Sequence, residues 1–219
     1  MRAVIFANGP LSYPDRARAL ILPDDWVIAA DGGARHCLKL GLKPAVIVGD
    51  VDSLHESELG TLRSQGSKLV RYPHNKDQTD LELALRHVLA SGASEILIFG
   101  GVGDRWDQTL ANLLLPVLPD MPKTRIWLVD GPFRATVIRS GGSLQLDGQP
   151  GDIVSLVPLG GTALGVTTTG LEYPLTDEPL AFGSTLGISN SMLGNSASVE
   201  LEIGVLAVFI TRSTEGADA

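Results

Sequence analysis

Short apolar runs alternate with helical segments along the first 130 residues, and this alternation constrains the fold more than any other feature. Six runs have the length of a strand and are mostly apolar; they cover residues 3–7, 26–30, 45–48, 68–72, 95–99 and 125–129. Strands of this kind are typical of a parallel sheet that is covered by helices on both faces. We therefore predict a Rossmann-like α/β domain over residues 1–132.

Capping residues mark where several of the intervening helices are expected to begin. Two pairs have the spacing of a capping box, Ser53 with Glu56 and Thr79 with Glu82. They predict helices that begin at about residues 54 and 80. A third helix, capped by Asp107, is expected to run to residue 114.

The pattern changes after about residue 132. Helical periodicity ends, and glycine-rich turns separate short runs of Val, Thr, Leu and Ile. Residues 199–203 alternate between apolar and acidic side chains, as a half-buried strand does. The sequence predicts an all-β domain, a sandwich or a barrel, over residues 133–213, followed by a polar tail at 214–219.

The composition narrows the possible partners of the chain. Its formal net charge of −8 argues against binding to nucleic acid or to an anionic membrane, because both favour clustered Lys and Arg. No apolar run approaches the roughly 18 residues that a membrane span needs. Cys37 is the only cysteine, so no disulfide can form within the chain and a cytoplasmic location is expected.

Acidic residues follow several of the predicted strands. Asp31 follows the second apolar run, Asp50 and Asp52 follow the third, and Asp80 opens the helix after the fourth. The carboxyl ends of parallel strands lie along one edge of a sheet, so these side chains are expected to converge. If the backbone stays extended between them, Asp50 and Asp52 point to the same side.

Convergence of these acids predicts a metal–phosphate site. Mg²⁺ prefers carboxylate oxygens and usually shares them with substrate phosphates, which assigns it to Asp50, Asp52 and Asp80. Each acid taken alone is better explained as a solvated residue at a turn or a helix end. Three of them on one edge of the sheet favour the metal.

Other polar features near this edge are compatible with a phosphate ligand. Residues 100–103 (GGVG) lie between a strand and a helix, the usual place of a phosphate-binding loop, although they match neither a P-loop nor a full dinucleotide motif. Lys76 and Arg105 either neutralise phosphate oxygens or are ordinary solvated cations. The histidines have no ligand-like spacing and are interpreted as surface or packing residues: His36, His55, His74 and His87.

Together these segments resemble the thiamine pyrophosphokinases, and the resemblance covers nearly the whole chain. It rests on residues 31–33 (DGG), 49–53 (GDVDS), 76–80 (KDQTD), 100–101 (GG), 105–107 (RWD) with Asn112, 170–175 (GLEYPL) and 189–190 (SN). Two positions depart from the pattern of the family. Gln108 stands where a histidine is common, and Ser191 stands where an acid is often found.

The resemblance implies Mg²⁺-dependent transfer of a pyrophosphoryl group from ATP to the hydroxyl of thiamine, with release of AMP. It implies that Asp50, Asp52 and Asp80 hold the metal and that Asp31 joins them as a catalytic acid. It assigns the ATP side of the site to Lys76, Thr79, Gly100, Gly101, Arg105 and Asp107, and the thiamine side to Ser189 and Asn190. It also implies a homodimer.

Two other functions fit parts of the sequence. A sugar-nucleotide transferase also uses an Asp-x-Asp turn to hold a metal, but that function gives no role to residues 76–80. A non-catalytic module that binds thiamine or a nucleotide would keep the polar turn at Ser189 and Asn190. Such a module would not need three converging carboxylates. From the residues alone, Ser189 and Asn190 either bind a heterocycle or only close a turn.

Overall fold

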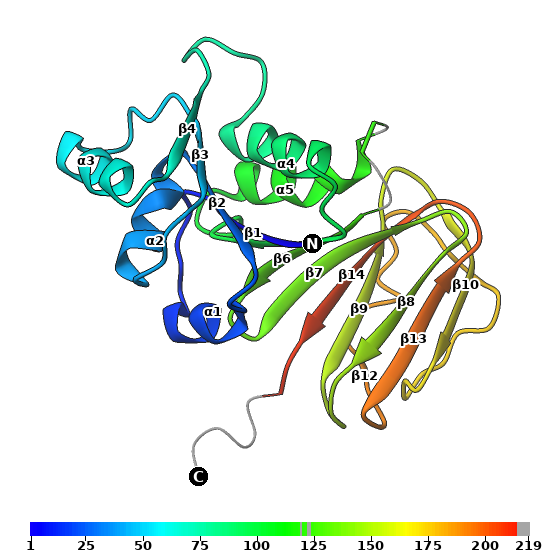
Figure 1. Cartoon of the computed structure of the whole chain (residues 1–219). Coiled ribbons are helices and arrows are strands. Elements are labelled where there is room, and N and C mark those ends of the chain that lie inside the picture. Colours follow the sequence, from blue (N-terminus) through cyan, green and yellow to red (C-terminus); the bar gives the residue numbers. More distant parts are fainter. Residues whose placement is uncertain (119, 122–123, 214–219) are drawn as a thin grey trace. The chain divides into compact units, whose positions relative to one another are not determined.

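The computed structural model describes residues 1–118, 120–121 and 124–213 (Figure 1). The chain divides into two compact units, Met1–Gly131 and Pro132–Ala219. The predicted tail, 214–219, lies outside the described residues. Within the described ranges, no helix has both the length and the apolar character that a membrane span requires.

The first unit is built on a sheet of parallel strands in the order β4-β3-β2-β1-β5-β6. The strands are β1 Arg2–Phe6, β2 Trp26–Ala30, β3 Val46–Gly49, β4 Lys68–Arg71, β5 Glu95–Phe99 and β6 Arg125–Asp130. The predicted parallel α/β architecture is confirmed. The order reverses between β1 and β5, and a reversal of this kind opens a crevice at the carboxyl ends of the strands.

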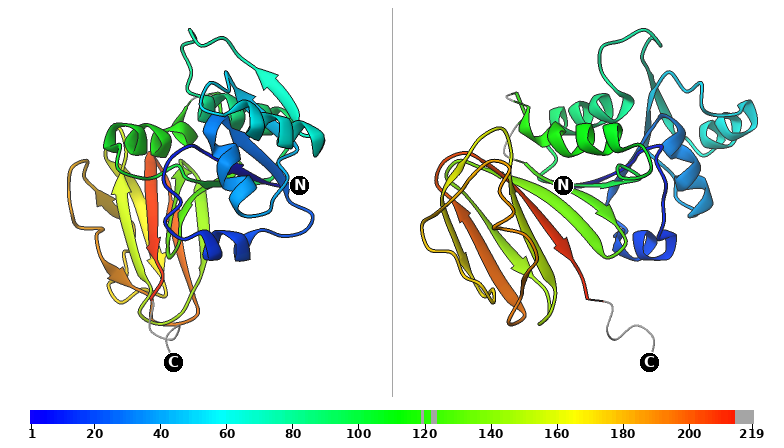
Figure 2. Two further views of the ribbon diagram at one scale, coloured as in Figure 1. Left: turned by 90° about the vertical axis from the view of Figure 1, so that its left-hand side faces the viewer. Right: turned by 180° about the vertical axis from the view of Figure 1, so that it is seen from behind.

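Helices cover both faces of this sheet (Figures 1 and 2). They are α1 Pro14–Leu20, α2 Ala34–Lys39, α3 Glu56–Ser64, α4 Asp80–Ala90 and α5 Trp106–Leu114. One face buries Val4 and Phe6 of β1 in a single apolar cluster with Ala17 of α1, Cys37 of α2 and Leu62 of α3. On the opposite face α4 packs against β1, β2 and β3, and α5 lies beside α4.

Two helices begin differently from the prediction. The capping box of α3 lies two residues later than expected: the N-cap is His55, whose backbone N–H donates to Glu58 at 2.8 Å. A turn precedes the helix: Val51 has a φ of 58°, and the Leu54 N–H donates to the Val51 carbonyl at 3.3 Å. The N-cap of α5 is Arg105, and Asp107 lies within the first turn of the helix instead of capping it.

Thr79 caps α4 as predicted. Its Oγ1 accepts a hydrogen bond from the backbone N–H of Glu82 at 3.2 Å. We expect Thr79→Ala to lower the free energy of unfolding by about 1 kcal/mol, because that N–H loses its acceptor. The midpoint of thermal unfolding, followed by circular dichroism without ligands, should fall by about 2–4 °C. Thr79→Ser keeps the hydroxyl and should unfold near the wild-type midpoint; an equal fall in both variants would contradict the capping role.

The second unit consists of antiparallel β-structure, which confirms the predicted all-β character. Its strands are β7 Phe133–Arg139, β8 Gly142–Asp147, β9 Ile153–Pro158, β10 Ala163–Thr169, β11 Glu178–Leu180, β12 Asn190–Ser191, β13 Ser196–Leu201 and β14 Val205–Thr211. One sheet has the order β12-β9-β14-β7 and the other β11-β10-β13-β8. Leu144 and Leu146 of β8 are buried, while their neighbours on the strand are exposed.

An ion pair between the buried Asp152 and the partly exposed Arg212 lies at the end of this unit. The Asp152 side chain accepts hydrogen bonds from the Arg212 guanidinium at 2.7 Å, from the Ser213 N–H at 2.7 Å and from the Gln149 N–H at 3.0 Å. Burial by itself raises the pKa of Asp152, but these donors outweigh it and hold the pKa below its ordinary value. Asp152 therefore stays ionised and joins two separate parts of the chain, residues 149–152 and 212–213.

Candidate active site

A cavity of about 370 Å³ opens at the carboxyl edge of the parallel sheet, within the first unit. Its walls come from the segments that follow the strands and from α4 and α5. The lining residues are Ala7, Asn8, Gly9, Ala30, Asp31, Asp50, His74, Lys76, Gln78, Thr79, Asp80, Leu81, Gly100, Gln108, Ala111 and Asn112. The reversal of strand order between β1 and β5 explains its position.

The segments after β1 and β5 stay paired beyond the strands. The Ala7 N–H donates to the Phe99 carbonyl at 2.8 Å, and the Gly9 N–H donates to the Gly100 carbonyl at 3.0 Å. Gly100 has a φ of 66°, and a Cβ at this position would lie 2.5 Å from the carbonyl oxygen of Ala7. Glycine is therefore required here for the two segments to approach each other.

Asp31 is a buried acid that faces this cavity. It follows β2 directly, has a φ of 46° and is only 6% exposed. Its Oδ1 has no hydrogen-bond partner among the described residues. Burying a carboxylate oxygen without a donor is costly, so the arrangement favours a cation at this position.

Lys76 lies between two of the acids. Its Nζ donates to Asp80 at 2.5 Å and lies 3.9 Å from the Asp50 carboxylate. Burial works to lower the pKa of Lys76, but the hydrogen bond to Asp80 and the charges of Asp50 and Asp31 raise it above its ordinary value. Burial raises the pKa of Asp80, and the like charges of Asp31 and Asp50 add to this effect against the opposing effect of Lys76.

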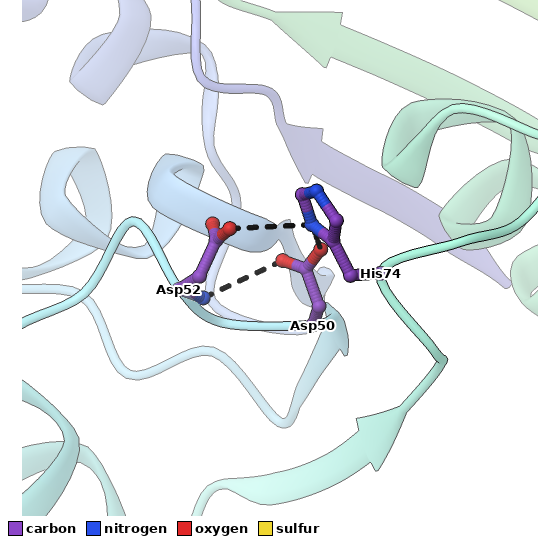
Figure 3. Close-up of side chains that lie close together, drawn as sticks. All are labelled: Asp50, Asp52 and His74. Carbon is purple, nitrogen blue, oxygen red and sulfur yellow. Dashed lines mark hydrogen bonds and ion pairs between the residues drawn. The ribbon is translucent and has the colours of Figure 1, made fainter.

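Asp50 and Asp52 meet at His74 (Figure 3). The His74 Nδ1 lies 2.8 Å from Asp50 Oδ2 and 3.4 Å from Asp52 Oδ2. The backbone between the two acids is not extended, so the condition under which they would point to the same side is not met: Val51 is in the left-handed region with a φ of 58°. The hydrogen bond with His74 lowers the pKa of Asp50 below its ordinary value, and the pKa of His74 is raised by the same bond.

The acids therefore form two groups that share Asp50. Oxygens of Asp31, Asp50 and Asp80 all lie within 4.8 Å of one another, and so do the ligand atoms of Asp50, Asp52 and His74. The structure brings all four predicted acids to one edge of the sheet. It separates Asp52 from the group that contains Asp80.

Some of the predicted nucleotide-binding residues line the cavity, and the others do not. Lys76, Thr79 and Gly100 line the cavity, whereas Gly101, Arg105 and Asp107 are not among its lining residues. Arg105 and Asp107 are exposed and hydrogen-bonded to each other at 2.6 and 2.9 Å. This bond with Arg105 lowers the pKa of Asp107 to about 2. The buried Gly101 accepts a hydrogen bond from Asn112 at 2.7 Å through its carbonyl.

The predicted thiamine-binding residues lie in the second unit. Asn190 bonds to the backbone of Tyr173: its Oδ1 accepts from the Tyr173 N–H at 3.0 Å and its Nδ2 donates to the Tyr173 carbonyl at 2.7 Å. The Ser189 N–H donates to the Ser155 hydroxyl, and Ser189 has a φ of 61°. Asn190 thus holds the loop around Tyr173, whose side chain is 66% exposed.

Sequence reasoning gave no site role to several polar residues that line the cavity, among them His74, Asn8 and Asn112. His74 was interpreted as a surface or packing residue, yet it contacts two acids. Asn8 is the first polar residue after β1, the same signal that identified the acids, and it lines the cavity. Asn112 lines it from α5.

Family models match both units of the chain. Residues 17–128 match the model described as thiamin pyrophosphokinase, catalytic domain, and residues 143–206 match that described as thiamin pyrophosphokinase, vitamin B1 binding domain. A thiamine pyrophosphokinase of Bacillus subtilis is 31% identical over 188 residues, which are 86% of this chain and 87% of that protein.

Solved structures give the same result. A crystal structure of the Bacillus subtilis thiamine pyrophosphokinase superposes with a TM-score of 0.85 at 27% identity, covering 97% of this chain and 100% of the other. A thiamin pyrophosphokinase from Geobacillus thermodenitrificans gives a TM-score of 0.84 at 28% identity, covering 98% and 99%. The similarity therefore includes both units.

Proposed function

The chain belongs to the thiamine pyrophosphokinase family, and from this premise we propose that it transfers the β,γ-diphosphoryl group of ATP to the hydroxyl of thiamine. The thiamine hydroxyl oxygen forms a bond to the β-phosphorus and gives up its proton to a base. The bond between the β-phosphorus and the oxygen bridging it to the α-phosphorus breaks, and AMP leaves with that oxygen. The products are thiamine diphosphate and AMP.

The observation that carries this proposal is the meeting of Asp31, Asp50, Asp80 and Lys76 at one cavity beside Gly100. Phosphoryl transfer depends mainly on positioning and on neutralising charge, and a site with several carboxylates can do so only with cations among them. Lys76 supplies one positive charge. The free N–H groups at the start of α4, which Thr79 caps, favour an anionic ligand nearby.

The residues present fit Mg²⁺. The buried Asp31 Oδ1 lacks a donor among the described residues, and it lies with oxygens of Asp50 and Asp80 in a set of hard ligands. Asp50, Asp52 and Asp80 remain the predicted metal ligands, and Asp31 is a candidate fourth. When bound, Mg²⁺ would neutralise phosphate oxygens. In this proposal the negative charges of Asp31 and Asp80 help to position the nucleotide with its cation. Lys76 orients the Asp80 carboxylate through their hydrogen bond.

The remaining contacts are assigned by family membership. Gly101, Arg105 and Asp107 are proposed to contact ATP together with Lys76, Thr79 and Gly100. Release of Arg105 from Asp107 would provide a guanidinium for phosphate. Ser189 and Asn190 lie within the segment that matches the vitamin B1 binding model, which supports their place on the thiamine side.

Three further features are part of the same proposal. A Rossmann-like description of the first unit is supported by its reversal of strand order, and a sandwich description of the second by its two antiparallel sheets. A homodimer and a cytoplasmic location are expected of the chain as a family member. Light scattering of the purified chain in solution should give twice its mass of 23.1 kDa.

Product analysis tests the reaction. Incubation with ATP, Mg²⁺ and thiamine should yield AMP and thiamine diphosphate in equal amounts, and both should disappear when thiamine is omitted or EDTA is added. Formation of ADP and thiamine monophosphate would contradict diphosphoryl transfer. Turnover of a nucleotide sugar, without AMP formation, would support the sugar-nucleotide alternative. Binding of thiamine without any turnover would support a binding module.

A further inference from the structure

We infer that Asn112 and Thr109 of α5 are positioning residues of the proposed reaction, because they hold the glycine-rich loop, residues 100–103, beside the cavity. The inference rests on the proposed function. Asn112 belongs to the sequence pattern that resembles the family, yet the proposed ATP and thiamine contacts do not include it. The loop and the start of α5 carry these proposed ATP contacts: Gly100, Gly101, Arg105 and Asp107.

The glycine-rich loop can make little side-chain packing of its own. Every residue in it except Val102 is a glycine, and glycine leaves the backbone more freedom than any other residue. Gly100 is held by the segment after β1, since its carbonyl accepts from the Gly9 N–H at 3.0 Å. The order of the residues that follow must come from contacts with another element.

Two side chains of α5 supply these contacts. The Asn112 Nδ2 donates to the carbonyl of the buried Gly101 at 2.7 Å. The Thr109 hydroxyl accepts from the Gly103 N–H at 3.1 Å and donates to the Gly103 carbonyl at 3.2 Å. Residues three positions apart lie on one face of a helix, so Thr109 and Asn112 reach the same loop.

Apolar burial contributes little to the placement of α5. None of its residues, all of which the structure describes, is buried, and Trp106 and Leu110 are 84% and 56% exposed. In most surface helices a buried apolar face makes the attachment to the rest of the domain. The placement of α5 beside the loop therefore depends on the hydrogen bonds of Thr109 and Asn112.

The same hydrogen bonds fix groups that are proposed to meet the nucleotide. Thr109 closes residues 103–109 into a loop that contains Arg105 and Asp107. Asn112 itself lines the cavity. A ligand binds more tightly where its contacts are already in place, because fewer groups lose freedom on binding. We therefore expect both residues to act mainly on the affinity for ATP.

Hydrogen exchange of the full-length chain without ligand tests the attachment. Thr109→Val removes the acceptor of the Gly103 N–H, and Asn112→Ala removes the donor to the Gly101 carbonyl. The amides of residues 100–104 should exchange at least about tenfold faster in both variants, because local opening becomes easier. Exchange at the wild-type rate in both variants would overturn the inference.

Two further variants are controls for this experiment. Thr109→Ser keeps the hydroxyl and should restore the exchange of the wild type. Thr61→Val makes the same change as Thr109→Val on α3, where the exposed hydroxyl donates to the Ser57 carbonyl, and should leave residues 100–104 unaffected. Circular dichroism verifies that each variant is folded.

Initial rates of AMP formation separate a positioning role from a general structural one. In Thr109→Val and Asn112→Ala, kcat/KM for ATP should fall about tenfold, mainly through KM, while KM for thiamine stays within about twofold of wild type. Thr109→Ser and Thr61→Val should keep both KM values. An unchanged KM for ATP would overturn the inference, and so would an equal rise for ATP and thiamine.

Failure of the proposed function would give a different result. The wild type itself would then form no AMP from ATP and thiamine. Exchange at residues 100–104 needs no ligand, so it would still show whether Thr109 and Asn112 hold the loop.

Discussion

Asp80→Asn should abolish most of the turnover of ATP and thiamine, lowering kcat by at least about 10²- to 10³-fold. The substitution keeps the size of the side chain and removes its charge. Asp80 lies with Asp31 and Asp50 around one cavity and accepts a hydrogen bond from Lys76, so the loss affects both the proposed metal and the lysine. Asp50→Asn should cost at least as much, because Asp50 belongs to both acidic groups.

The matched control is Asp24→Asn. Asp24 is exposed and precedes β2, at the edge of the sheet opposite the cavity, so its loss should leave kcat within about twofold of wild type. AMP formation is measured at saturating substrates, and circular dichroism verifies that each variant is folded. Wild-type rates in folded Asp50→Asn and Asp80→Asn would refute the assignment of these acids to the reaction.

Asp152→Asn should have the largest effect on stability. The substitution removes the charge that pairs with Arg212 and weakens the acceptor of two backbone N–H groups. We expect the free energy of unfolding to fall by about 2–4 kcal/mol. Trp26, Trp106 and Trp127 all lie in the first unit, so tryptophan fluorescence would not follow unfolding of the second unit, which contains Asp152. Denaturant unfolding should therefore be followed by circular dichroism.

The same side chain makes stability depend on pH. The pKa of Asp152 is lower in the folded chain than in the unfolded one, so its contribution is complete above the unfolded-state pKa of about 4. That contribution disappears as the pH falls through the lower folded-state pKa. Asp152→Asn should therefore lose less stability than the wild type in this acid range, while Asp147→Asn, an exposed substitution on β8, should follow the wild type. Equal losses in the wild type and Asp152→Asn would contradict this role.

Much of the first unit could be predicted because its strands and helix caps are defined by patterns within short stretches of sequence. Buried parallel strands are mostly apolar, and their carboxyl ends share an edge, so residues as far apart as Asp31 and Asp80 were expected together before any contact was known. Capping by Thr79 was predictable for the same reason, since the hydroxyl and its N–H partner are three residues apart.

Other features depend on the path of the chain between elements. Val51 is β-branched, and residues of this type avoid the left-handed region, so no local preference predicted its φ of 58°. The contact of His74 with Asp50 joins residues 24 positions apart, through loops that follow neighbouring strands. Arg105 and Asp107, which are predicted to contact a nucleotide, form an ion pair with each other at 2.6 Å that the sequence analysis did not predict.

The parallel pairing of β1 with β5 has a consequence for synthesis of the protein. The chain must close a long loop to make this pair: the N-terminal amine of Met1 donates to the hydroxyl of Ser94, 93 positions further along. Closing a loop of this length costs about 4 kcal/mol of chain entropy. On the ribosome β1 emerges first, but the segment after it cannot meet Gly100 until β5 has also emerged. All four acids are therefore translated before the paired segments at Gly9 and Gly100, which line the cavity, can form.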